Sequence, residues 1–351
     1  MKSTRLVAAS VAVLGIVLNL LSSAPAPHGK PMVVSYRVLG DEEKIYALAF
    51  SPDGKRLLAG VERSGSENDQ VVEWDIARRS VSRRFSLAHS GQTISLRFSP
   101  SGRWLVIGQL DGRVSVSNPA GRVLSSFKVS EESGTMLELA TISERNGVFV
   151  NAIVGNNLAQ RRDLTTERVR NFPIPCDDYR IHSAAGTRDG AAFVCCSPKF
   201  VNLYPEGRFD SPRRLRAFDC FEGRVITHVA IADDASTVVA FESNDGYLAM
   251  VDAKNDRLIK KWKGHDERMI YTIIPFHRRN WFATGNDAGE IEIWDEKGGC
   301  RALLKHEDFD LTIASLALTR DDGLLASSGV QQPIVVWDLR ALLAQEVPKP
   351  K

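Results

Sequence analysis

The chain has 351 residues, of which 43% are hydrophobic and 25% charged, a composition typical of a soluble globular protein. Its length fits one large all-β domain or two ordinary domains. The formal net charge is +2, and without Lys2 and Arg5 there are 43 basic and 43 acidic residues, so the composition excludes general polyanion binding and we expect no nucleic-acid partner.

The N-terminus combines two basic residues with an apolar segment, Leu6–Leu21, which small residues and prolines follow. This order is typical of a secretory signal peptide over residues 1–24, with a linker over 25–32. An uncleaved membrane anchor over 6–21 and an apolar tail without a targeting role are the alternatives. We therefore expect an exported protein, periplasmic or extracellular, that meets a membrane only through this segment if it is uncleaved. The absence of any Asn-x-Ser/Thr site favours a bacterial export route.

From Val33 onward the chain consists of repeated units, each with an apolar segment before a turn of small or acidic residues. The turns are Asp53-Gly54, Ser101-Gly102, Asn146-Gly147, Asp189-Gly190, Asp233-Asp234, Arg279-Asn280 and Asp322-Gly323, and their second residues are 43 to 48 positions apart. Three or four short β segments per unit and no helical pattern predict an all-β, seven-bladed β-propeller of four-stranded antiparallel blades.

Short motifs recur at equivalent places in these units. They are Ala49–Lys55 (AFSPDGK), Phe98–Gly102 (FSPSG), Gly264-His265 and the pairs Trp74-Asp75, Trp294-Asp295 and Trp337-Asp338. On these motifs the chain resembles the WD-repeat family from Val33 to about Leu343. The resemblance implies structural repeat positions at Trp74, Asp75, Asp111, Asp245, His265, Thr284, Trp294, Asp295, His306, Ser327, Trp337 and Asp338.

The chain departs from that family in one respect. Well-formed WD repeats link His, Ser/Thr and Trp side chains to an Asp in the turn before the Trp-Asp strand. The positions of that Asp in the sixth, seventh and first units hold Ala288, Gln331 and Asn68. Where Asp111 and Asp245 supply it, Ser117 and Val251 replace the Trp. Because no unit completes the network, we expect apolar packing between blades to dominate the stability.

The segment Val33–Leu39 precedes the first unit and has no unit of its own. We expect it to pair as the outer strand of the seventh blade and close the ring, which removes a free sheet edge. The predicted organisation is therefore a single propeller over 33–343 and a disordered tail over 344–351.

No catalytic or phosphate-binding motif occurs, so we expect no enzyme and no cofactor. His182 and His228 fall on predicted innermost strands, where a metal or quinone site is conceivable, although structural histidines are the commoner explanation. Five cysteines lack zinc spacing. Buried thiols are the default for them, and Cys176 with Cys220 is the one pairing that merits a test.

The loops at the channel entrance offer polar candidates for partner binding. They are Asp266, Glu267, Arg268, His306, Glu307, Asp308, Asn244 and Asp245. In the resembled family this face usually receives a protein or peptide. The sequence therefore predicts a monomeric, non-enzymatic interaction scaffold acting outside the cytoplasm. The alternatives are an extracytoplasmic propeller enzyme or ligand binder, quinoprotein-like or lactonase-like, and a stand-alone sensor module.

Overall fold

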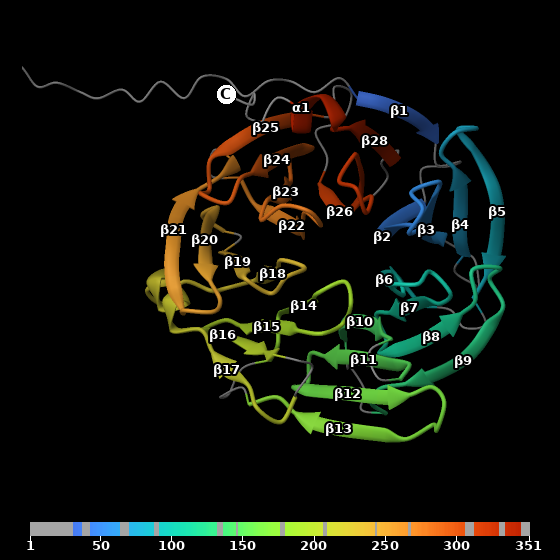
Figure 1. Ribbon diagram of the computed structural model, residues 1–351, viewed down its shortest axis with the longest axis horizontal. Helices are drawn as coiled ribbons and strands as arrows, with labels where there is room; N and C mark the ends of the chain where they lie inside the picture. The colour runs from blue at the N-terminus through green and yellow to red at the C-terminus, as the bar shows by residue number, and fades with distance from the viewer. Residues whose placement is uncertain are drawn as a thin grey trace, which may run out of the picture.

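The chain forms a ring of seven small antiparallel sheets around a central axis (Figure 1). The computed structural model describes residues 31–36, 43–63, 70–87, 91–131, 136–144, 147–175, 180–205, 209–242, 244–265, 268–305, 312–329 and 334–344. Each sheet has four strands and is one blade of a β-propeller. The predicted fold class is confirmed.

In six blades the four strands follow one another in sequence from the axis outward, and in blade 7 the outermost strand is β1. Blade 1 consists of β2 (Glu43–Phe50), β3 (Arg56–Arg63), β4 (Gln70–Asp75) and β5 (Ser80–Ser86), and blade 2 of β6 (Thr93–Phe98), β7 (Leu105–Gln109), β8 (Arg113–Ser117) and β9 (Val123–Lys128). Blade 3 consists of β10 (Leu137–Ser143), β11 (Phe149–Val154), β12 (Leu158–Asp163) and β13 (Val169–Pro173), and blade 4 of β14 (Ser183–Gly186), β15 (Phe193–Ser197), β16 (Phe200–Tyr204) and β17 (Arg213–Arg214).

The remaining blades repeat this order. Blade 5 consists of β18 (His228–Ile231), β19 (Thr237–Glu242), β20 (Tyr247–Asp252) and β21 (Arg257–Lys263), and blade 6 of β22 (Ile270–Pro275), β23 (Phe282–Asn286), β24 (Glu290–Trp294) and β25 (Cys300–Lys305). Blade 7 consists of β26 (Ile313–Leu318), β27 (Leu324–Gly329), β28 (Ile334–Asp338) and β1 (Pro31–Tyr36). A 3-10 helix, η2 (Arg216–Phe221), and a short helix, α1 (Arg340–Ala344), complete the described elements.

The burial of the strands follows from their place in the ring. Middle strands such as β7 and β15 are buried at every residue, because a neighbouring blade covers each face of the sheet. The outermost strand β5 instead alternates between exposed and half-buried side chains, the period-2 pattern of a strand with one face in solvent.

The hydrophobic core is divided among the junctions between blades. The buried apolar side chains of the described residues fall into seven clusters, and each cluster joins two neighbouring blades. Leu57 and Trp74 of blade 1, for example, pack with Ala326 and Val336 of blade 7. A single blade therefore has no core of its own, and the ring is stable only when it is closed.

The ring is closed by the N-terminal strand, as the sequence predicts. Strand β1 pairs antiparallel with β28, with Pro31 opposite Trp337 and Tyr36 opposite Ile334. The first and last parts of the chain thus share blade 7, and the outer edge of β28 is covered.

The turn between the first and the second strand has the same backbone hydrogen bond in six blades. In six blades the residue directly after the innermost strand donates its N–H to the carbonyl five positions on, at 2.9 to 3.0 Å; these residues are Ser51, Ser99, Thr187, Ala232, Phe276 and Thr319. Three positions after this residue, Gly54, Gly102 and Gly190 have positive φ, and Ala235 and Asp322 stand at the same place in blades 5 and 7. In those two blades the turn is therefore displaced by one residue from the sequence prediction.

Candidate functional site

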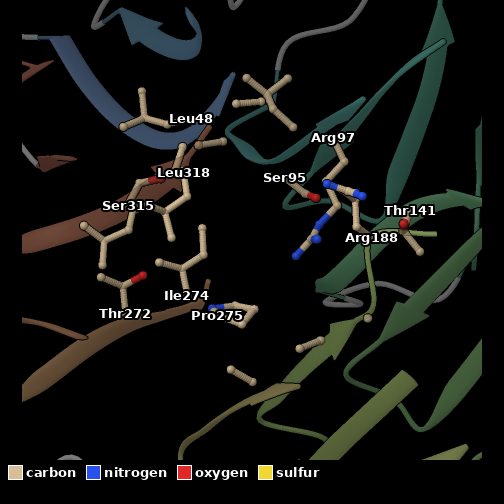
Figure 2. A pocket seen from close by; sticks show the side chains of 18 of the residues that line it. Leu48, Ser95, Arg97, Thr141, Arg188, Thr272, Ile274, Pro275, Ser315 and Leu318 are labelled. Atoms are coloured by element: carbon tan, nitrogen blue, oxygen red, sulfur yellow. The ribbon is translucent and has the colours of Figure 1, made fainter. Parts of the chain in front are cut away.

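The central channel is a cavity that all seven blades create together. All seven innermost strands line it, and its volume is about 410 Å³. Hydroxyl groups of Ser95, Thr272 and Ser315 and apolar side chains of Leu48 and Ile274 face its middle part (Figure 2). We call the side on which the innermost strands begin the entrance face, and the side on which they end the turn face.

At the entrance end of the channel, three titratable side chains come from consecutive blades: Glu138 on β10, His182 before β14 and His228 on β18. Burial raises the pKa of Glu138 to about 8. Burial, together with the charge of His182, lowers the pKa of His228 to about 4, and burial also lowers the pKa of His182. All three groups are therefore mainly uncharged at pH 7.

The predicted placement of His182 and His228 at the channel agrees with the lining residues. The ring of His228 stacks on Phe241, with centroids 4.7 Å apart, and its Nδ1 has no hydrogen-bond partner among the described residues. Within that part of the chain, no three His, Cys, Asp or Glu side chains are grouped so that they could hold a metal ion. The two histidines alone are too few ligands for a metal site.

The turn-face end has a different composition. One residue further along each of the six equivalent turns stand Pro52, Pro100, Arg188, Asp233, His277 and Arg320, and all six line the channel. Asp233 accepts the backbone N–H of Arg188 at 2.9 Å and lies 2.8 Å from Nδ1 of His277. Burial opposes ionisation of Asp233, but the hydrogen bond and charge of His277 and the contacts with Arg188 outweigh it, so the pKa of Asp233 is lowered.

Acidic side chains on the turn face also bind backbone groups of the preceding blade. Glu144 of blade 3 accepts the N–H of Ser101 at 2.8 Å. Asp322 of blade 7 accepts the N–H groups of His277 and Arg278, at 2.7 and 2.9 Å. With Asp233, these bonds join blades 2 to 3, 4 to 5 and 6 to 7. They satisfy exposed and part-buried backbone donors that the turns leave without a partner within their own blade.

The entrance face carries the predicted partner-binding residues that the structure describes. Asn244 and Asp245 form an exposed turn whose N–H groups Glu242 accepts at 2.7 and 2.9 Å. Asp245 also pairs with Arg224, and Arg268 is exposed before β22. Asp266, Glu267, His306, Glu307 and Asp308 lie outside the described residues, so these candidates stay predictions.

Four exposed apolar side chains from blades 3, 5 and 6 lie on the entrance face. Met136 and Met269 directly precede β10 and β22, Tyr271 lies on β22 at the channel, and Val225 precedes β18; they are 38 to 49% exposed. The other large hydrophobic side chains that are this exposed in the described part of the chain lie on outermost strands: Leu124, Val169, Leu258 and Ile259.

The polar network expected from the family resemblance is present in part in blade 6. Thr284 Oγ1 accepts the indole N–H of Trp294 at 2.8 Å and lies 2.7 Å from Nε2 of His265. We assign the hydroxyl hydrogen to the bond with Nε2, which places the ring proton on Nδ1. That Nδ1 is buried without a partner among the described residues, and burial lowers the pKa of His265 to about 3. Ala288 occupies the position of the missing Asp.

The other repeat positions have local roles. In blade 7 the indole N–H of Trp337 donates to Ser327 Oγ at 2.9 Å, while His306 lies outside the described residues. Asp75, Asp111 and Asp295 accept N–H groups of the turns that follow them, and Asp338 pairs with Arg340. Trp74 is buried between blades 1 and 7.

The four cysteines that the structure describes differ in exposure. Cys195 and Cys196 are buried, whereas Cys220 is half-buried and Cys300 exposed, so the default expectation of a buried thiol is wrong for Cys300. Cys176 lies outside the described residues, so its pairing with Cys220 stays a prediction.

Sequence reasoning missed two groups that the structure brings into the channel, Arg97 and Glu138. Neither belongs to a motif. They could have been found by counting how many residues separate each position from the turn that follows it. Residues at equal distances before equivalent turns lie at a similar depth along the axis of the ring. The same count places Arg188, Asp233, His277 and Arg320 in one layer.

Comparison with known proteins identifies relatives of this chain. The family described as WD domain, G-beta repeat matches residues 34–75 and 81–116. The WD repeat domain-containing protein 83 homolog of Dictyostelium discoideum is 22% identical over 275 residues, 71% of this chain and 81% of that protein. The transducin beta-like protein 3 of Bos taurus is 22% identical over 85% of this chain and 42% of its own length. The transcription initiation factor TFIID subunit 5 of Caenorhabditis elegans is 31% identical over 102 residues, 29% of this chain and 15% of that protein.

These matches support the WD40-repeat family for this chain, on both the repeat sequence and the seven-bladed fold. They contradict the prediction of an exported, periplasmic or extracellular protein of bacterial type. The relatives are WD-repeat proteins of eukaryotes, one of them a transcription initiation factor subunit, and none is named as exported. Residues 1–30 lie outside the described part of the chain, and none of the helices described has the length and apolar character that a membrane crossing requires. The prediction of an exported protein is therefore wrong, whereas the signal peptide or anchor predicted over residues 1–24 lies outside the described residues and stays a prediction.

Proposed function

We propose that this chain is a non-enzymatic interaction scaffold whose WD40-type propeller, over residues 33–343, binds a protein partner on the entrance face. The observation that carries the proposal is the position of Met136, Val225, Met269 and Tyr271, exposed apolar side chains around one mouth of the channel. Exposed apolar groups that cluster on one face are typical of protein interaction sites, and methionine adapts to partners of different shape.

The polar groups beside these side chains suit the rim of such an interface. Asn244, Asp245 and Arg268 are exposed, and Asp245 is already oriented by Arg224. A rim of this kind sets the orientation of the partner, while the buried apolar centre supplies most of the affinity. Because the blades hold the face rigidly, binding requires little ordering of the scaffold.

The relatives point in the same direction. One of them is by its name a subunit of a transcription initiation factor, and none of those reported above is named as an enzyme. None of these three names identifies the partner of this chain. We propose that the scaffold is a monomer, since the ring closes within one chain; light scattering after size exclusion would measure its mass directly.

The proposal is tested by protein capture with matched variants. The immobilised chain and a Met269→Lys/Tyr271→Lys variant are exposed to an extract of the source organism, and bound proteins are quantified by mass spectrometry. We expect the variant to lose at least about 90% of a partner that the unchanged chain retains, because charges would enter the apolar centre of the interface. A Leu258→Lys/Ile259→Lys variant on outermost strand β21 is the control and should retain it.

Charge reversal provides a second test on the same face. Asp266→Lys, Glu267→Lys and Asp308→Lys together should abolish partner binding, while thermal unfolding should show an intact fold. Equal capture by the entrance-face variants, the β21 variant and the unchanged chain would assign the partner to another surface.

A further inference from the structure

Arg97 is the one channel arginine whose charge lies deep in the cavity. It extends from β6 toward the axis, where Figure 2 shows its side chain and that of Arg188 directed into the cavity and toward one another. Across the described residues, no hydrogen bond or ion pair reaches its guanidinium group. Asp233 acts on it only through longer-range attraction, and burial lowers its pKa. The Arg97 side chain is half-buried in the wall of the channel, so its unpaired N–H donors face the cavity and are available to an anion.

Two more arginines enter the same end of the channel from other blades. Arg188 of blade 4 has its Nε 4.0 Å from Asp233, and Arg320 of blade 7 is exposed at the mouth on the turn face. The described residues that line the cavity include two carboxyl groups, Asp233 and Glu138. Glu138 lies at the opposite end and is mainly protonated at pH 7. Three guanidinium groups therefore face one carboxylate.

That carboxylate is already engaged. Its two oxygens accept the backbone N–H of Arg188 and face Nδ1 of His277, so it has little capacity left for Arg97. The unmatched charge at this end of the channel is close to two positive charges. An anion of about the same charge would restore the balance.

We propose that the turn-face end of the channel is a binding site for a phosphate group, held between Arg97 and Arg188, with Arg320 at the entry. Guanidinium groups offer paired N–H donors in the geometry of phosphate oxygens, which makes them the preferred side chains for this anion. A cavity of about 410 Å³ has the size of a small-molecule site rather than of a nucleic-acid groove. The site lies on the face opposite the proposed protein interface and does not depend on it.

The phosphate group has two possible sources with the same chemistry, a small phosphorylated molecule or a phosphorylated side chain of a partner. The depth of Arg97 favours the small molecule, because a ligand must enter the channel to reach it. The near-zero balance of charge in the whole chain excludes general attraction of polyanions as the cause, so binding should depend on these side chains specifically.

Isothermal titration calorimetry at constant ionic strength tests the site, with inorganic phosphate and pyrophosphate as the probes. We expect one site per chain, and an affinity at least about tenfold weaker in Arg97→Gln and in Arg188→Gln, the loss typical of one hydrogen-bonded ion pair. Arg257→Gln removes the same charge from the exposed start of β21 and should change the affinity less than about twofold. A phosphoserine peptide that binds when the inorganic probes do not, with the same loss in Arg97→Gln, would assign the phosphate to a protein partner.

A stability measurement separates ligand binding from a structural role. Arg97→Met removes the unpaired charge, so without phosphate it should unfold at the same temperature as the unchanged chain or higher, and added phosphate should stabilise the unchanged chain alone. The proposal is overturned if none of the three probes binds, or if binding is the same in the Arg97 and Arg188 variants. It is also overturned if Arg97→Met loses stability while Arg188→Gln binds phosphate normally, since Arg97 would then be structural.

Discussion

The two ends of the central channel are made by the same seven strands yet differ in chemistry. At the entrance end, burial keeps Glu138, His182 and His228 mainly uncharged. At the turn-face end, Asp233 is charged and hydrogen-bonded, and arginines from three blades line the cavity. Every innermost strand starts at one end and finishes at the other, so each end collects one position of the repeat from every blade.

Side-chain hydrogen bonds within blade 6 also differ from those that connect neighbouring blades on the turn face. The network within blade 6 leaves Nδ1 of His265 without a partner in the described part of the chain, whereas the carboxylates of Asp233 and Asp322 bind groups of the neighbouring blade. On the turn face, polar bonds of Asp233 and Asp322 therefore connect neighbouring blades in addition to the apolar clusters at the same junctions.

The largest effect is expected from Asp322, whose carboxylate accepts two backbone N–H groups of blade 6 and whose φ is +63°. Asp322→Ala should reduce the free energy of unfolding by about 3 kcal/mol, because two part-buried N–H donors lose their acceptor and Ala is strained at this φ. Asp322→Asn keeps an acceptor and tolerates the conformation, so it should cost about 1 kcal/mol. Chemical denaturation measures both, and equal losses would show that the bonds between blades contribute little.

Asp233→Asn tests the same face through pH. Because the folded-state pKa of Asp233 is lowered, its contribution is present above the unfolded value near 3.8 and is lost as the pH falls through the folded value. The variant should be about 2 kcal/mol less stable at pH 7, and the difference should shrink as the pH falls below 3.8. A difference that does not depend on pH would mean that the charge of Asp233 has no role.

Glu138→Gln tests the entrance end, where the expected sign is opposite. A folded-state pKa of about 8, against 4.5 as the ordinary value, favours folding at low pH and loses this contribution as the pH rises toward 8. Between pH 5 and pH 8, the free energy of unfolding of the Gln variant should therefore rise by about 1 to 2 kcal/mol relative to the unchanged chain. A site without any solvent screening would give a larger rise. Thermal unfolding across this range measures the gain, and parallel profiles would contradict the burial of a neutral carboxyl group.

The smallest effect is expected from completing the network of blade 6. Ala288→Asp should place an acceptor beside Nδ1 of His265 and raise the free energy of unfolding by about 1 kcal/mol. In a His265→Phe background the same change should give no gain, which a double-mutant cycle measures. A gain that persists without His265 would come from the turn itself and not from the network.

The fold could be predicted because its signals are local. Gly54, Gly102 and Gly190 mark turns that need positive φ, and alternating apolar residues mark the strands between them. Counting these turns gave seven blades, and a leftover segment at the N-terminus with no blade of its own indicated how the ring closes. The position of the turns in blades 5 and 7 was one residue off, since Ala235 and Asp322 adopt a conformation that sequence patterns assign to glycine.

The sequence by itself thus determined the blades, their number and the closing strand, because the turn residues and strand patterns recur within each repeat and one segment is left without a repeat. Only the tertiary structure decided what converges on the axis. Arg97, Arg188 and Arg320 are about 90 to 220 positions apart, and the bonds of Asp233 and Asp322 cross between blades at separations of 44 and 45 residues. Their charge states depend on how closure of the ring excludes water, which no single repeat encodes.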